Sequence, residues 1–115
     1  MWTLKTTDKY FYRHYLQILN GILKLTRTEQ SVLAQFMDIK DSLDKTDLSE
    51  DLKNSLLFGA DNRKYVQESL NMSEHNLNNY IKMLRDKQMI IGESINPKLY
   101  IKKQNGSKIS FELST

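Results

Sequence analysis

The stretch Leu70-Asn71-Met72-Ser73 restricts the fold of this chain more than any other part of its sequence. Asn71 is the type of non-glycine residue that most readily adopts a positive φ, Met72 suits a buried corner, and Ser73 suits a helix N-cap. A sequence of this kind joins two helices at a steep angle through a turn of three or four residues. It therefore predicts one helix that ends near residue 70 and another that begins at residue 73.

The helix expected after this turn, over 73–87, has two different faces. Leu77, Ile81 and Leu84 recur at intervals of four and three residues, so this side faces a core. The other side is polar and rich in amides, and it displays His75, Asn76, Asn79, Lys82 and Asp86, with Asn78 at its edge. An asparagine can pair bidentately with adenine in the major groove, and a lysine can neutralise phosphate or reach guanine. Base contact is the favoured interpretation, and a merely solvated face is the other.

Composition narrows the class of protein. The 115 residues suit one hydrophobic core, and no apolar run is long enough to span a membrane. The absence of cysteine excludes disulfides, thiol catalysis and thiolate metal sites. The net charge of +3 weakly favours a polyanionic partner. With no recognisable secretion signal at the start, we expect a cytoplasmic protein.

The first part of the chain predicts a short strand at Trp2 to Lys5 and a helix, capped by Thr7 or Asp8, that runs to about Lys24. Its apolar face is expected to consist of Phe11, Tyr15, Leu19, Ile22 and Leu23. Off this face lie Tyr10, Tyr12, Arg13 and His14. These side chains could stack on bases or ribose, but we give more weight to packing on the core or against a second copy of the chain.

The middle of the chain predicts three further helices. Thr26 and Glu29 form a capping-box pattern that opens a helix to about Lys40, with a buried face of Val32, Leu33, Phe36 and Met37. The acid-rich stretch 38–51 is expected to be a solvated connector, and its spacing does not match a calcium loop. A short helix starts at Ser49 or Asp51, and another follows over about 62–70, with Asp61 as N-cap and Val66 facing inward.

After Lys87 the apolar residues alternate with polar or amphipathic ones, and this period of two predicts three short antiparallel strands. The first begins at 89–91, a turn follows within 94–97, the second includes 99–101, and Asn105-Gly106 is a hairpin signal before the third at 109–113. Four lysines dominate this ribbon: Lys98, Lys102, Lys103 and Lys108. They suit contact with phosphates or a minor groove, although edge lysines also deter aggregation.

Several stretches together carry a resemblance to a known family: Arg63-Lys64-Tyr65-Val66, 70–73, Asn76-Leu77-Asn78-Asn79-Tyr80-Ile81, 84–90 and Asn96-Pro97. In this order, with a β-hairpin after the helices, they resemble winged helix-turn-helix proteins, in the branch of MarR-type regulators and plasmid or phage replication initiators. The resemblance covers about residues 25–103. It implies a recognition helix at 73–87 in the major groove and a wing against the flanking backbone.

The expected fold is mainly α with a small antiparallel β wing (α+β), a winged helix-turn-helix in one domain over 1–115. Residues 1–25 form an N-terminal strand and aromatic helix, 26–87 a helical core and 88–115 the wing. The implied function is sequence-specific binding of double-stranded DNA, as a transcriptional regulator or a phage or plasmid replication initiator. The predicted DNA-binding residues are Arg63, Lys64, Ser73, His75, Asn76, Asn78, Asn79, Lys82, Lys98, Lys102, Lys103 and Lys108.

Two departures from the family pattern bear on function. Gln88 and Asn71 stand where family members commonly have glycine, and the recognition helix has only Lys82 and Arg85 as early cations. A monomer is therefore expected to bind DNA weakly, and a homodimer through the first helix would present two recognition helices. The rival interpretation is a protein-binding adaptor in a viral or plasmid replication or transcription assembly. No catalytic constellation is present in the sequence, so we expect no enzyme, cofactor or metal.

Overall fold

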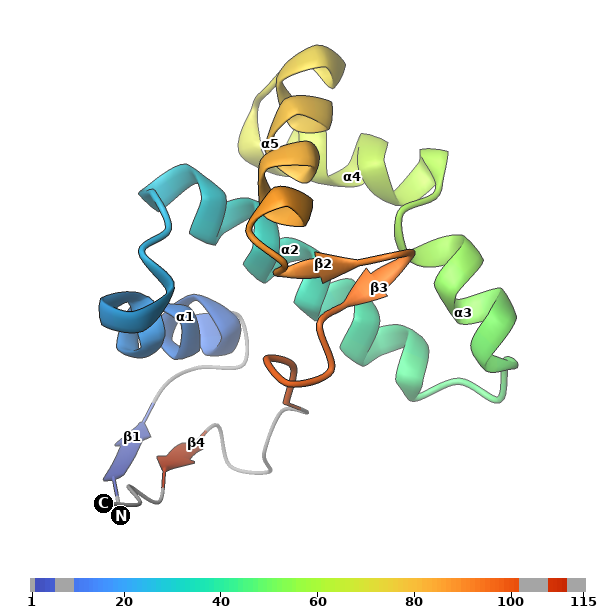
Figure 1. Cartoon of the computed structure of the whole chain (residues 1–115). Helices are drawn as coiled ribbons and strands as arrows, with labels where there is room; N and C mark the ends of the chain where they lie inside the picture. The colour runs from blue at the N-terminus through green and yellow to red at the C-terminus, as the bar shows by residue number, and fades with distance from the viewer. Residues whose placement is uncertain (1, 6–9, 102–107, 112–115) are drawn as a thin grey trace.

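The structure, a computed structural model, describes residues 2–5, 10–101 and 108–111. Helix α2 (Arg27–Asp44) runs through its middle, and the other described helices pack against it (Figure 1). These helices are α1 (Phe11–Leu23), α3 (Glu50–Leu57), α4 (Ala60–Leu70) and α5 (Glu74–Asp86). The predicted capping box opens α2, because the Thr26 hydroxyl accepts from Glu29 N at 3.2 Å and Thr26 N donates to the Glu29 carboxylate at 2.8 Å.

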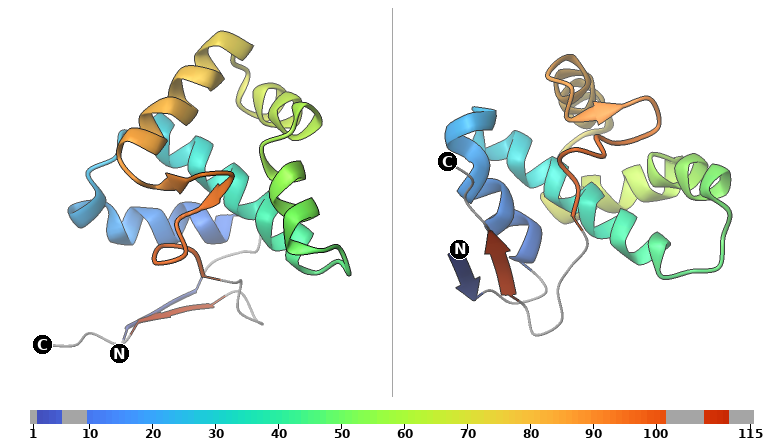
Figure 2. Two further views of the ribbon diagram at one scale, coloured as in Figure 1. Left: turned by 45° about the vertical axis from the view of Figure 1, so that its right-hand side comes forward. Right: turned by 60° about the horizontal axis from the view of Figure 1, so that its bottom comes forward.

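In the described ranges, four short strands form two antiparallel sheets. β2 (Ile90–Ile91) pairs with β3 (Ser94–Ile95), with Ile90 opposite Ile95. β1 (Trp2–Lys5) pairs with β4 (Lys108–Phe111), with Trp2 opposite Phe111. The two sheets lie apart in both views of Figure 2. The predicted mainly helical α+β class is confirmed, and so is the short strand at the start of the chain.

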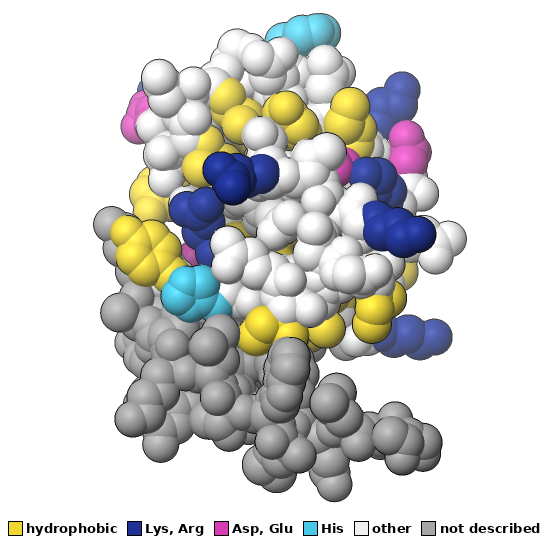
Figure 3. Space-filling model, turned by 90° about the vertical axis from the view of Figure 1, so that its left-hand side faces the viewer, with side chains coloured by type: hydrophobic (Ala, Val, Ile, Leu, Met, Phe, Trp, Pro, Cys, Tyr) yellow, Lys and Arg dark blue, Asp and Glu magenta, His cyan; other side chains and the backbone are white. Residues whose placement is uncertain are grey.

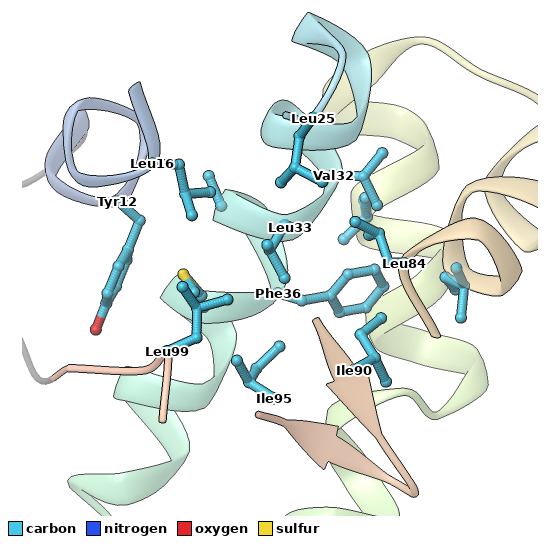
Figure 4. Packing of buried hydrophobic residues seen from close by; sticks show 14 of the residues in the cluster. Tyr12, Leu16, Leu25, Val32, Leu33, Phe36, Leu84, Ile90, Ile95 and Leu99 are labelled. Carbon is cyan, nitrogen blue, oxygen red and sulfur yellow. The ribbon is translucent and has the colours of Figure 1, made fainter. Parts of the chain in front are cut away.

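The core lies between α1, α2, α5 and the β2–β3 hairpin (Figure 4). The predicted buried face of α2 is confirmed, because its four residues are fully buried: Val32, Leu33, Phe36 and Met37. From the other elements come Leu16, Leu84, Ile90 and Ile95. Each side chain of this kind contributes about 1.5–3 kcal/mol when it leaves water, so this cluster fixes how α5 sits on the rest of the molecule.

The predicted apolar face of α1 is partly wrong. Tyr12, expected off the apolar face, is 1% exposed, whereas Ile22, expected on it, is 81% exposed. The Tyr12 and Tyr15 hydroxyls donate to backbone carbonyls of the segment 99–101, which satisfies both phenols inside the protein. Tyr12 is therefore not available to stack on bases. The helix begins at Phe11, and the expected caps Thr7 and Asp8 lie outside the described residues.

The stretch 38–51, expected to be a solvated connector, is mostly helical. Helix α2 continues past residue 40 to Asp44, and only 45–49 separate it from α3. Asp41 is buried and pairs with Lys45 at 3.1 Å, and Lys40 pairs with Asp44 at 3.9 Å. Opposite charges four residues apart stabilise a helix, which explains why the acids extend it. The predicted N-cap Ser49 of α3 is confirmed, whereas α4 is capped by Gly59 rather than by Asp61.

The predicted three-stranded ribbon is also wrong. The turn of the β2–β3 hairpin lies at Gly92-Glu93, and Gly92 has a φ of 60°. The segment 99–101 is not a strand, because carbonyls that a neighbouring strand would need accept from tyrosines of α1. β4 pairs with β1 and not with this segment. The expected Asn105-Gly106 turn lies outside the described residues.

Candidate nucleic-acid interface

The turn between α4 and α5 has the geometry that its sequence predicts. Asn71 adopts φ 53° and ψ 52°, in the left-handed region. Met72 N donates to Gln67 O at 3.0 Å, which closes the end of α4 in the manner of a Schellman motif. The Ser73 hydroxyl accepts from Asn76 N at 3.1 Å and caps α5. Both helix ends are thereby fixed by local hydrogen bonds, so the direction of α5 is set.

Helix α5 presents one face to the core and the other to solvent. Leu77, Ile81 and Leu84 are buried, as predicted. The outward face consists of exposed residues: His75, Asn76, Asn78, Asn79, Lys82, Arg85 and Asp86. In Figure 1 the helix stands at one edge of the molecule, with its start farthest from the β1–β4 sheet. No described element covers the amide-rich side, so a large partner can approach it.

Two hydrogen-bonded pairs order this face. The Asn79 Nδ2 atom lies 3.3 Å from His75 Nε2, one helical turn away. Arg63 of α4 donates through Nη1 to Asn78 Oδ1 at 3.2 Å. The Asn78 carbonyl is thus already engaged by Arg63, which places a guanidinium beside the amides. Asn76 uses its backbone N–H for the cap, and its side chain is exposed.

The end of α5 is tied to the start of α2 by an ion pair. Lys87 Nζ lies 2.8 Å from a Glu29 carboxylate oxygen, and the Glu29 side chain is 2% exposed. Burial acts to raise the pKa of Glu29, but hydrogen bonds from Lys87 and Thr26 outweigh it and lower the pKa below its ordinary value. Gln88 then turns the chain toward β2 with a φ of 63°. This is the position where glycine was expected from the family pattern.

The predicted cationic residues do not all come together. Lys64 is exposed on α4, and Lys82 is exposed on α5. Lys98 is exposed in the turn after β3, on a segment that runs away from α5 toward the β1–β4 sheet in Figure 1. Lys102 and Lys103 lie outside the described residues, and Lys108 is described only as backbone in β4. The basic ribbon expected beside the recognition helix is therefore not formed by the β2–β3 hairpin, which carries no lysine.

Arg85 is exposed on the outward face of α5 but is not among the predicted DNA-binding residues. Its guanidinium donates through Nη2 to Gly92 O at 3.4 Å, so it links α5 to the hairpin tip. The neighbouring Glu93 is exposed and makes this tip acidic. The signal that could have identified Arg85 is its position three residues after Lys82, on the same side of a helix.

Comparisons with protein-family models, with curated proteins and with solved structures find no match for this chain. Within the described residues no cluster of three or more His, Asp or Glu side chains could hold a metal ion. None of the described helices has the length and apolar character needed to cross a membrane. The exposed, amide-rich face of α5 is therefore the feature of the molecule that best indicates a function.

Proposed function

We propose that the chain is a winged helix-turn-helix protein that binds double-stranded DNA in a sequence-specific way, as a transcriptional regulator or a replication initiator. In this proposal α4 and α5 are the helix-turn-helix, α5 is the recognition helix and β2–β3 is a short wing. The supporting observation is the row of exposed His and Asn side chains on α5, opposite its buried face. Asparagine is a poor helix former, so folding alone gives no reason to place several here.

The geometry suits the major groove, which is wide enough to admit an α-helix. Asn76 and the His75–Asn79 pair occupy the first two turns of α5, where recognition helices meet base edges. Lys64 and Lys82 would neutralise phosphates on either side. Because the α4–α5 turn is fixed by Asn71, the helix that carries Asn76 and the His75–Asn79 pair is oriented before DNA arrives, which reduces the ordering cost of binding.

The test is selection from a random duplex library followed by fluorescence anisotropy at several salt concentrations. Replacing Asn76 and Asn79 together by Ala should relax sequence preference by about 10-fold or more, because each bidentate amide–base pair supplies about 1–3 kcal/mol of discrimination. Lys82→Gln should instead weaken all duplexes alike and reduce the slope of log K against log salt by about 1.

Asn54→Ala is the matched control, because Asn54 is a partly exposed asparagine on α3, away from this face. It should leave both affinity and preference unchanged. Wild-type protein that selects no sequence, or binds no duplex even at low salt, would overturn the proposal.

A protein-binding adaptor is the second candidate function, and a specific observation favours it. Three large apolar side chains are about half exposed on α4, α5 and β2: Tyr65 (58%), Met83 (48%) and Ile91 (51%). Exposed aromatic and Met side chains are enriched at protein interfaces. If the adaptor function holds, Met83→Ser would abolish capture of a protein partner, whereas the Asn76 and Asn79 substitutions would have no effect on it.

A further inference from the structure

A small polar cavity lies between α1 and the start of α2, apart from the residues assigned to DNA contact. Its volume is about 150 Å³, and it is lined by Arg13, Gln17, Arg27, Gln30 and Ser31. Pockets for drug-sized ligands measure roughly 300–1,000 Å³, so this one suits a small ion or a single chemical group. All five lining side chains are polar or charged, which excludes an apolar occupant.

Within the part of the chain that the structure describes, no acidic side chain offsets the positive charge of this cavity. Among the described residues, no Asp or Glu lines it, and neither Arg13 nor Arg27 takes part in an ion pair. The nearest acid along α2 is Glu29, whose carboxylate is engaged by Lys87 and Thr26. Two guanidiniums that face the same small space repel each other unless an anion lies between them. The left-hand side of the molecule in Figure 1, seen face-on in Figure 3, displays several Lys and Arg side chains together with a few Asp or Glu side chains.

The hydrogen bonds already made in the cavity indicate which groups can serve a ligand. The Ser31 hydroxyl donates to Arg27 O at 3.1 Å, and Gln30 Nε2 donates to Leu25 O at 3.2 Å. These bonds fix the side chains of Ser31 and Gln30 in the lining of the cavity. The two guanidiniums and the Gln17 amide supply the remaining donors, and each guanidinium alone has five N–H groups in a planar fork.

We infer that this cavity, formed by Arg13, Gln17 and Arg27, is a binding site for a phosphate group. Two guanidinium forks and an amide line the cavity from two different helices, and this number of donors suits a tetrahedral anion with several acceptor oxygens better than a carboxylate with two. Both arginines are exposed, so a phosphate ester can enter with its remainder outside. The phosphate can belong to a free small molecule or to a nucleic-acid backbone, because the chemistry in the cavity is the same.

The test is an NMR titration of the full chain with inorganic phosphate, glycerol phosphate and acetate, following backbone amides. Saturable shifts should concentrate at residues 13, 17, 27, 30 and 31, and acetate should bind at least about 10-fold more weakly than phosphate. Arg13→Gln and Arg27→Gln should each weaken phosphate binding by about 10-fold or more, because each removes charge-assisted hydrogen bonds. Lys45→Gln removes the same charge from the far end of α2 and should leave binding unchanged.

A titration with a short duplex separates the two sources of phosphate. If the duplex shifts the resonances of the same backbone amides, the phosphate that binds belongs to a nucleic-acid backbone. If only glycerol phosphate shifts them, the ligand is a free phosphate ester. The inference is overturned if phosphate shifts are absent or spread evenly over all basic residues, or persist in both arginine variants. It does not depend on DNA recognition by α5, because the Asn76 and Asn79 substitutions leave this cavity intact.

Discussion

Glu29 is buried and yet ionised at neutral pH. Its Oε1 atom accepts hydrogen bonds from Thr26 N and Lys87 Nζ, both at 2.8 Å. Burial alone would raise its pKa, but these bonds hold the pKa below the ordinary value of 4.5. One carboxylate thus caps α2 and anchors the end of α5, so the position of the proposed recognition helix depends on it.

Glu29→Gln should lower the free energy of unfolding at pH 7 by about 1–2 kcal/mol, because it removes hydrogen bonds to a charged group, one of them partly solvent-screened. Since the folded-state pKa is lowered, this stabilisation is fully present above about pH 4.5 and is lost as the pH falls through the lowered pKa. Urea unfolding at pH 7 and pH 3 measures it. The difference between wild type and variant should shrink at pH 3.

Glu50→Gln is the matched control, because the Glu50 side chain is 73% exposed. It should change stability by less than about 0.5 kcal/mol at either pH. A gap between wild type and Glu29→Gln that is equally large at pH 3 would contradict the assignment.

Gln88 adopts a φ of 63°, which costs an L-residue about 1–2 kcal/mol relative to glycine. Gln88→Gly should therefore raise the melting temperature, with a net gain of up to about 1 kcal/mol after the greater freedom of glycine in the unfolded chain is subtracted. Differential scanning calorimetry measures it. Gln35→Gly, inside α2, should instead destabilise by about 1 kcal/mol. Equal losses in both variants would contradict the role of backbone strain.

Helix α1 binds the chain segment that follows the β2–β3 hairpin. Tyr12 OH donates to Ile101 O at 2.8 Å and Tyr15 OH donates to Leu99 O at 2.6 Å. Tyr12 also stacks on Tyr100, with ring centroids 5.9 Å apart. Burial raises the pKa of both phenols of α1, so they act as neutral donors. The hairpin therefore leads into a segment that is fixed to a helix rather than into a longer wing.

Tyr15→Phe should cost about 1–3 kcal/mol at pH 7, because Leu99 O loses its buried donor. Because burial raises the pKa of Tyr15, its contribution is fully present below about pH 10 and is lost as the pH rises above that value. Urea unfolding at pH 7 and pH 10.5 should show a smaller pH dependence in the variant than in wild type. Tyr65→Phe changes an exposed tyrosine, so this variant should match wild type in its stability at pH 7 and in the pH dependence of its stability.

Local signals predicted the elements that depend on local bonds. The capping box, Asn71 in the α4–α5 turn and the buried face of α5 are each determined within a few residues. The wing and the face of α1 could not be predicted in this way. Their partners lie more than 80 residues away: Tyr15 meets Leu99 across 84 positions and Tyr12 meets Ile101 across 89. Periodicity shows which residues are apolar, but not which distant carbonyl will accept a phenol.

If α5 contacts DNA as proposed, its shortage of cations predicts that one copy of the chain binds DNA weakly. We propose that two copies associate through the part of α1 that faces solvent. Ile22 is 81% exposed there, and Ile18, Leu19 and Leu23 lie beside it, half-buried. Two recognition helices in one assembly would reach adjacent half-sites and multiply the affinity of each.

Ile22→Asp should convert such a dimer to a monomer and weaken binding to a symmetric duplex by at least about 10-fold, while half-site binding stays the same. Light scattering and anisotropy on both duplexes measure the two effects. Leu52→Asp is the control, because Leu52 is an exposed leucine on α3, outside both α1 and the proposed wing. A wild-type protein that is monomeric at all concentrations and on DNA would contradict the dimer.

The pairing of β1 with β4 joins residues 2–5 to residues 108–111, so it closes a loop of almost the entire chain. Closing so long a loop costs conformational entropy. The four residue pairs between β1 and β4 offset this cost only narrowly, because a two-stranded sheet on its own is marginally stable in water. This sheet should therefore assemble late in folding and open first, without disturbing the helices around α2. Opening this sheet would then require less free energy than unfolding the whole molecule. Amide hydrogen exchange would show weaker protection in β1 and β4 than in the helices around α2.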